Sequence, residues 1–302
     1  MGAGSDPPLR RTLVSAVAAV VALVAPNAAV ASELIGRDAS DVRIEADAQG
    51  RALISFRSGG QTKRLLASGA IDARPPSRVR PQVAFQLSYG GSIGPNTCRR
   101  YTGPPLAWQV AACTASDGSH WAVQAWQRLL PNYGAPASGD RAARELRLSH
   151  WTGAPAKIEV WTDWSYRRFH HLYGRLTYRG QGVFGFRSTR FGVPLDTYGR
   201  NVFVDTFDSA YGSGWMRENS FLTHAPGGGF CYGFYPHGAH GVGSGKRYRA
   251  TVIGPGVTPD VMWQGPGLHP YNKQNPADVS LESAMNAERD TIRAGYGKCS
   301  HN

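Results

Sequence analysis

The residues best suited to chemistry lie in the middle of the chain, between Lys157 and His237, where carboxylates and histidines are mixed with aromatic rings. The candidates for acid–base catalysis are Asp163, Asp205, Glu218 and His171. Glycosidases hold two carboxyl groups about 5–9.5 Å apart. Glu159 and Asp163 are about 13 Å apart along an extended strand, which is too wide. A catalytic pair would therefore need a carboxyl group from a second strand.

Aromatic side chains in the same stretch predict a ligand platform. Alternation along residues 157–164 places Trp161 on one face of a strand with Glu159 and Asp163, and Trp164 on the other face. A ring flanked by carboxylates suits the apolar face and the hydroxyls of a sugar. The expected ligand-binding residues are Trp161, Trp164, Tyr166, Tyr173 and Trp215. The alternative is that Trp161 packs against a second layer, as large aromatic side chains more often do.

Asp205 lies between Phe203 and Phe207 on one face of another alternating segment. In such surroundings a carboxyl group either has a raised pKa and acts as an acid, or is bound by a buried donor. An arginine such as Arg200 or Arg217 would be a suitable donor.

The histidines do not favour a metal site. His237 and His240, with His224 upstream, lie in a glycine-rich segment that lacks a regular element to fix the rings. The adjacent His170 and His171 would point to opposite faces of a strand, and His170 is expected to be a hydrogen-bonded core residue. No metal and no other cofactor is predicted.

The first 31 residues have the pattern of a signal peptide. Arg10 and Arg11 precede the apolar run Leu13–Ala25, and Ala29-Val30-Ala31 supplies small residues before a cut. The general secretory route fits best, a loose twin-arginine signal is the alternative, and an uncleaved anchor is a third. The protein is thus expected to be secreted or extracellular, with no stable membrane span in the mature chain because no second long apolar run follows.

The formal net charge of +12 favours an anionic partner. The arginines are scattered in small groups, whereas a nucleic-acid-binding protein would gather them on one face, so no nucleic acid is expected. A polysaccharide or an anionic cell-envelope polymer fits better. The alternative is that the charge only aids solubility.

The predicted fold is mainly β, either a β-sandwich or a curved antiparallel sheet, with one C-terminal helix at about residues 276–294. Its expected apolar face carries Leu281, Ala284, Met285 and Ile292. The proposed organisation is a signal peptide at 1–31, a small β-hairpin region at 32–73, a linker rich in proline and arginine at 74–81, and a main domain at 82–302.

Four cysteines in an exported chain predict two disulfides. Of the three pairings, the sequential one is preferred, Cys98–Cys113 and Cys231–Cys299. The absence of C-x-x-C argues against a redox motif or a cysteine zinc site.

Two phrases, FCYGFYPH at residues 230–237 and GPGVTPDV at 254–261, resemble an uncharacterised family of exported bacterial proteins. The resemblance extends over most of the mature chain and implies no fold, activity or ligand. Two functions are therefore weighed: non-catalytic binding of a glycan or anionic wall polymer, which is preferred, and a secreted glycosidase-like hydrolase that uses a carboxylate pair. A purely structural secreted domain is a third hypothesis.

Overall fold

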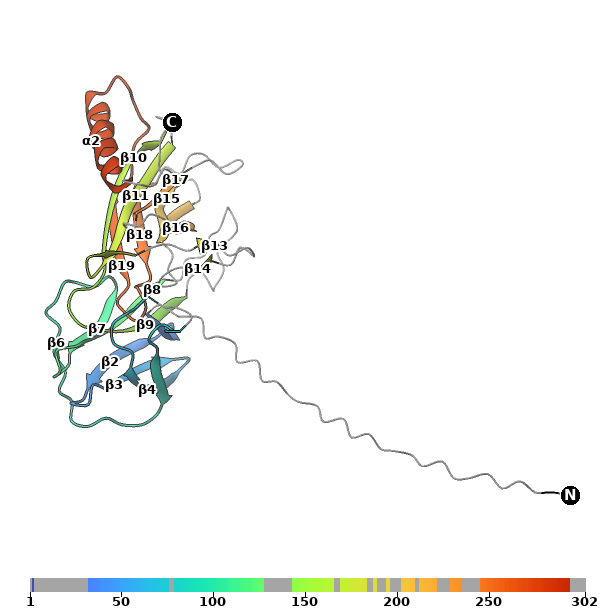
Figure 1. Cartoon of the computed structure of the whole chain (residues 1–302), viewed down its shortest axis with the longest axis vertical. Helices are drawn as coiled ribbons and strands as arrows, with labels where there is room; N and C mark the ends of the chain where they lie inside the picture. The colour runs from blue at the N-terminus through green and yellow to red at the C-terminus, as the bar shows by residue number, and fades with distance from the viewer. Residues whose placement is uncertain are drawn as a thin grey trace.

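The computed structural model describes residue 2 and residues 32–75, 79–127, 143–165, 169–183, 187–188, 194–195, 202–209, 212–221, 229–234 and 245–293. Within them the protein is mainly β, with several antiparallel sheets and one C-terminal helix, as the sequence predicts. Figure 1 shows the sheets in two halves, with the strands up to residue 151 in one half and the later strands and the helix in the other. No helix in the described part of the chain is both long and apolar enough to cross a membrane.

The first half is a sandwich of two antiparallel sheets, here called the N-terminal sandwich. One sheet has the order β1 (Glu33–Arg37), β9 (Arg144–Trp151), β8 (His120–Gln127), β7 (Gln109–Thr114) and β6 (Arg99–Arg100). The other has the order β2 (Ser40–Ala46), β3 (Ala52–Ser58), β4 (Gln61–Gly69) and β5 (Phe85–Tyr89). Alternating apolar residues bury one face of each sheet, so that Ile54 and Leu65 share a core with Val123 and Leu148.

Strand pairing in this half crosses the segment rich in proline and arginine. β4 pairs with β5 on its far side, and β1 pairs with β9. The Gln82 amide accepts a hydrogen bond from the Arg74 backbone N–H at 3.0 Å and donates one to the Arg74 carbonyl at 2.5 Å. These two hydrogen bonds hold Arg74 and Gln82 together.

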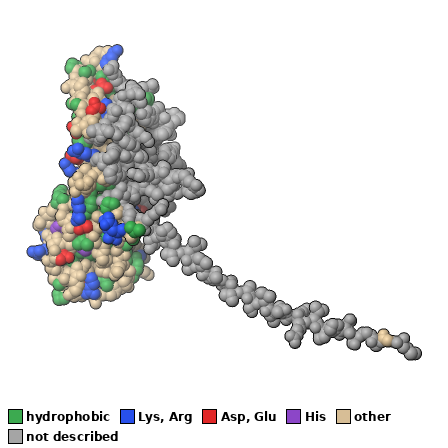
Figure 2. All heavy atoms as spheres, viewed as in Figure 1, with side chains coloured by type: hydrophobic (Ala, Val, Ile, Leu, Met, Phe, Trp, Pro, Cys, Tyr) green, Lys and Arg blue, Asp and Glu red, His purple; other side chains and the backbone are tan. Residues whose placement is uncertain are grey.

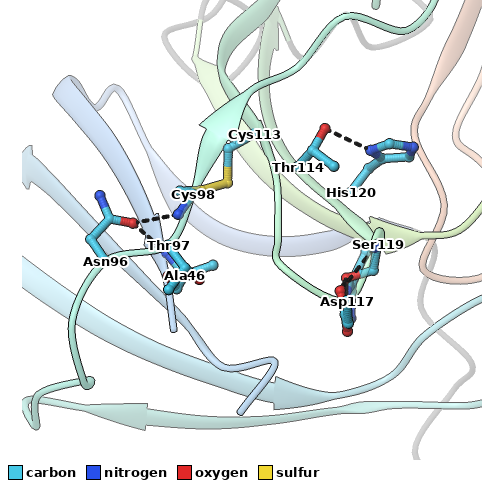
Figure 3. The surroundings of a disulfide bond; sticks show 10 residues. Ala46, Asn96, Thr97, Cys98, Cys113, Thr114, Asp117, Ser119 and His120 are labelled. Carbon is cyan, nitrogen blue, oxygen red and sulfur yellow. Dashed lines mark hydrogen bonds between the residues drawn. A yellow bond between two sulfur atoms is a disulfide. The ribbon is translucent and has the colours of Figure 1, made fainter. Parts of the chain in front are cut away.

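The first expected disulfide is present between Cys98 and Cys113, with a Cα–Cα distance of 5.6 Å (Figure 3). Asn96 strengthens the same corner, because its side-chain oxygen accepts hydrogen bonds from the backbone N–H groups of Ala46 and Cys98. Of the two expected disulfides, this is the one whose two cysteines both lie among the described residues. The other expected pair includes Cys299, which lies outside the described residues, so that pairing stays a prediction.

The second half is also built from two sheets. The helix-covered sheet has the order β10 (Lys157–Ser165), β11 (Phe169–Tyr178) and β12 (Gln181–Gly182), with β17 (Gly229–Phe234) also paired to β11. The junction sheet has the order β16 (Gly212–Phe221), β15 (Val202–Ser209), β18 (Arg247–Val252) and β19 (Val261–Pro266). A short pair, β13 (Arg187–Ser188) and β14 (Pro194–Leu195), stands apart. Val160 and Leu172 of the helix-covered sheet meet Val204 and Ala250 of the junction sheet in one core.

The helix α2 (Pro276–Arg293) begins at the residue predicted, and the Asn275 side-chain oxygen caps it by accepting the Ala277 N–H at 3.1 Å. The expected apolar face is wrong for Leu281 and Ala284, which are exposed, whereas Met285 is half-buried and the side chain of Ile292 is not among those described. Leu281 is 38% exposed, whereas Arg289 is buried, so the helix docks through polar contacts. The physical reason is that the sheet surface beneath it presents the buried carboxylate of Asp163, which binds Arg289.

The two halves join where the turn between β18 and β19 meets the N-terminal sandwich. The His150 N–H donates to the Val257 carbonyl at 2.9 Å. The Gln124 side chain bonds both backbone groups of Asp260, each at 2.9 Å. These contacts fix the second half on strands β8 and β9.

Candidate functional site

The outer face of the helix-covered sheet holds a buried acid between two cationic or titratable partners. The antiparallel register of β10 and β11 places Asp163 directly opposite His171. His171 Nδ1 donates to one Asp163 oxygen at 2.6 Å, and Arg289 of α2 donates to the other at 2.7 Å. Asp163 is fully buried, so the helix encloses this cluster.

Aromatic rings extend the cluster toward the sheet edge. Tyr173 stacks between His171 and Trp161, with ring centroids 5.4 and 5.9 Å away. Its hydroxyl donates to the Met285 carbonyl of α2 at 2.6 Å, and burial raises the pKa of Tyr173 well above its usual range. Tyr173 therefore acts as a hydrogen-bond donor that secures the helix.

The expected ligand-binding residues of this region differ in access. Trp161 is half-buried, whereas Trp164 lies on the opposite face, buried, with its indole N–H donating to the His269 carbonyl at 2.8 Å. Tyr166 lies outside the described residues, as do His224, His237 and His240. Glu159 accepts hydrogen bonds from Arg175 and Lys157, which hold the pKa of its carboxyl group below the usual value.

The outer face of the junction sheet holds a second buried acid, Asp205, and two of its partners are arginines. Arg217 donates through Nε to one carboxylate oxygen and through Nη2 to the other at 3.3 Å. Arg249 donates through Nε to the second oxygen at 2.8 Å. Arg217 was one of the two donors that the sequence suggested for Asp205.

Arginines and aromatic rings alternate across this face, which we call the arginine–aromatic face. It consists of Phe203, Asp205, Phe207, Trp215, Arg217, Arg247 and Arg249. Arg217 lies 4.4 Å from the ring centroid of Phe203, and Arg249 lies 4.1 Å from that of Trp215. Arg247 lies 4.2 Å from the ring centroid of Phe207 and 5.4 Å from that of Trp215. These are cation–π distances, which orient the guanidinium groups.

One end of the arginine–aromatic face is covered and the other is open. Arg249 stacks on Trp108 at 5.3 Å and Arg217 lies 6.0 Å from Trp126, both rings belonging to the N-terminal sandwich. Arg247 at the other end is exposed. On the side of the molecule drawn in Figure 2, the described lysine and arginine side chains are spread over both halves. The arginine–aromatic face is therefore distinguished by the stacking of its arginines on aromatic rings.

The face carries three guanidinium groups and one carboxylate: Arg217 and Arg249 both bind Asp205, whereas Arg247 stacks on aromatic rings. Burial lowers the pKa of Arg249; the carboxylate of Asp205 opposes this, and the charges of Arg217 and Arg247 add smaller lowering effects. The face therefore favours the approach of a further anion.

Glu218 occupies a third layer, inside the second half. Its neighbour Arg217 points outward, and Glu218 accepts a hydrogen bond from the inward-facing Thr206 hydroxyl. His170 Nδ1 is hydrogen-bonded to the Tyr248 hydroxyl in the same core, as expected for a core histidine. Burial, with a smaller contribution from the charge of Glu218, raises the pKa of Tyr248.

The three candidate acids thus lie on three different layers. Asp163 is outside the helix-covered sheet, Glu218 is between the sheets, and Asp205 is outside the junction sheet. The fold does not bring them into one groove as a carboxylate pair.

Sequence reasoning missed a serine–histidine contact in the N-terminal sandwich. Ser119 Oγ lies 3.0 Å from His150 Nε2, and His150 Nδ1 donates to the Ala70 carbonyl at 2.9 Å. Both side chains are enclosed, with the two residues 1% and 3% exposed, so the contact connects strands and does not present a nucleophile. Burial lowers the pKa of His150, which favours the neutral form of the ring. No sequence pattern marks two residues that meet only through the pairing of β8 with β9.

Arg247 and Arg249 were also missed as site residues, although their spacing gave a signal. In β18 they alternate with Tyr248 and Ala250, which places both arginines on one face.

Comparison with family models, with curated proteins and with solved structures finds no match to this chain.

Proposed function

We propose that this protein is an exported, non-catalytic binding protein whose ligand is an anionic glycan or anionic cell-envelope polymer. The ligand would lie at the open end of the arginine–aromatic face. The observation that carries the proposal is the exposed guanidinium of Arg247, stacked on Phe207 and Trp215 beside two buried arginines that share one carboxylate.

The chemistry of this end suits a charged sugar. A guanidinium group presents paired donors that match a carboxylate or a phosphate, and a half-buried indole offers an apolar surface to a pyranose ring. Stacking on two rings limits the freedom of Arg247 before binding, which lowers the entropy lost when a ligand orders it. A bound anion would also offset the mutual repulsion of the three arginines.

Two further features support an exported binding protein. The Cys98–Cys113 disulfide suits an oxidising compartment, as expected for an exported chain. The separation of Asp163, Asp205 and Glu218 into three layers supports binding over hydrolysis by a carboxylate pair.

Two neighbouring cations on the same sheet allow a sharp test. Arg247→Gln removes a stacked charge, and Lys246→Gln removes an exposed charge that is paired with Asp208 at 3.2 Å. Both variants lower the net charge by one. Binding is measured as retention on insoluble wall sacculi and on immobilised polygalacturonate, with cellulose as the neutral control, at low and high salt.

We expect Arg247→Gln to weaken retention on the anionic polymers about tenfold, the effect of losing one good charged contact. Lys246→Gln should retain the wild-type affinity within about twofold, because its side chain lies off the stacked rings. Equal losses in the two variants would mean that only net charge matters. A wild-type protein that no polymer retains at low salt would refute the proposal.

A further inference from the structure

Ser32, the first residue after the expected signal-peptide cut, is completely buried. Its hydroxyl donates to Asp260 Oδ1 at 2.5 Å, and its carbonyl accepts a hydrogen bond from Arg147 at 3.1 Å. Asp260 belongs to the turn that joins the two halves. The residue at the start of the N-terminal sandwich is therefore bound to the second half of the protein.

Asp260 is a buried carboxylate whose hydrogen-bond donors are neutral. Besides the Ser32 hydroxyl, it accepts the Trp126 indole N–H at 2.9 Å and the Gly254 backbone N–H at 3.1 Å. Burial raises its pKa, and the Arg147 charge only partly opposes this. A cation placed beside Asp260 would offset part of the cost of burying its charge.

Cleavage before Ser32 would create that cation. Hydrolysis of the Ala31–Ser32 amide by an endopeptidase consumes one water, leaves a carboxylate on Ala31, and leaves a protonated amine on Ser32. The nitrogen of a serine lies within about 4 Å of its own Oγ by covalent geometry, and that Oγ is 2.5 Å from Asp260 Oδ1, so the new ammonium would be within about 6.5 Å of the carboxylate. Opposite charges at this separation favour each other's ionised form.

We infer that the bond before Ser32 is the processing site and that the new α-ammonium group forms a buried ion pair with Asp260 that locks the two halves together. The inference rests on the export stated in the proposed function and on the expected signal-peptide cut, but not on the ligand. Because Ser32 is enclosed in the folded protein, the cut must precede the docking of Ser32 onto Asp260.

The charges around the new amine come from three elements. Asp260 faces it from the turn between β18 and β19, and Glu33 follows it on β1, where burial raises the pKa of that carboxyl group. Arg147 on β9 is paired with Glu145 at 2.6 Å, and Glu145 also contacts Arg37 at 3.6 Å. Arg37 and Arg147 are thus both paired with Glu145. The new amine at Ser32 would be the cation next to Asp260.

The test compares two chains that differ at one end only. One starts at Ser32, and the other starts at Ala31, which moves the amine one residue away. We expect the chain starting at Ser32 to melt about 5 °C higher at pH 6.5. In the ion pair the amine has a folded pKa above its unfolded value of about 7.7–8, so the advantage is complete below that value and is lost as the pH rises through the folded pKa.

The Asp260→Asn variant completes a double-mutant cycle. We expect the substitution to abolish the difference between the two chains at pH 6.5. If the variant does not fold, the pH dependence of the difference between the two unsubstituted chains decides the matter. Equal melting temperatures at pH 6.5, or a difference that persists unchanged at high pH, would overturn the inference.

The N-terminus of the exported protein, read by intact mass, tests the cleavage independently. A mature chain that begins at Ser32 supports the inference, and one that begins elsewhere overturns it. Failure of the polymer-binding test leaves these outcomes unaffected, so the two failures are distinguishable.

Discussion

The two sheets of the second half each hold a fully buried carboxylate on their outer face, but they balance its charge differently. On the helix-covered sheet, Asp163 is matched by one arginine and by a histidine that can be neutral, and α2 closes over them. On the junction sheet, Asp205 is matched by two arginines, with a third arginine exposed at the open end. The first face is electrically balanced and covered, and the second is cationic and partly open.

This difference indicates that the helix-covered face has a structural role and that the face of the junction sheet is the better candidate for ligand binding. Both faces carry stacked aromatic rings, so aromatic content alone does not identify a binding surface. Tyr173 and Trp161 stack where a helix also needs attachment, whereas Phe207 and Trp215 stack against an exposed charge. We therefore place the ligand on the junction sheet.

The largest expected effect comes from removing each acid. Asp205→Asn leaves Arg217 and Arg249 buried together without an anion, and we expect it to lower the free energy of unfolding by about 3–5 kcal/mol. Asp163→Asn should cost about 2 kcal/mol, because it leaves one buried arginine rather than two without an anion, and Arg289 keeps a contact with Asn286. Urea unfolding measures both values.

Asp208→Asn is the control for these variants, because Asp208 lies on the same strand as Asp205 and pairs with the exposed Lys246. Its urea midpoint should match the wild type. An Asp163→Asn variant as unstable as Asp205→Asn would show that the two faces are balanced in the same way.

The next effect concerns binding. Trp215→Ala removes the ring that supports both Arg247 and Arg249, and we expect retention on anionic polymers to fall about tenfold. Trp161→Ala removes the half-buried ring of the other face and should leave retention unchanged. A loss of retention in Trp161→Ala as large as in Trp215→Ala would place the ligand on the helix-covered sheet instead.

The smallest effect is on the helix. Tyr173→Phe removes the hydrogen bond to the Met285 carbonyl and should lower the free energy of unfolding by about 1 kcal/mol. Binding to polymers should not change, since the hydroxyl lies beneath α2 on the other sheet. Altered retention in this variant would contradict the assignment of a purely structural role to the helix-covered face.

The sequence by itself determined the local structure. Alternation predicted which residues of β10 share a face with Trp161, and the asparagine–proline pair predicted where α2 begins, because both follow from backbone geometry within a few residues. The same local rule placed Asp205 between Phe203 and Phe207 and named Arg217 as a partner. The preferred sequential pairing of the cysteines also predicted the Cys98–Cys113 bond.

Only the tertiary structure decided which faces are covered and which charges meet. The helix packs Arg289 toward the sheet because the sheet presents the carboxylate of Asp163 at that point. The two residues are 126 positions apart in the sequence. Strand order places the three candidate acids, Asp163, Asp205 and Glu218, on separate layers. Packing of the two halves brings Ser32 into contact with Asp260, 228 positions away in the sequence. Periodicity shows which side of a strand a residue takes, but the partner facing that side comes from long-range packing that no local pattern specifies.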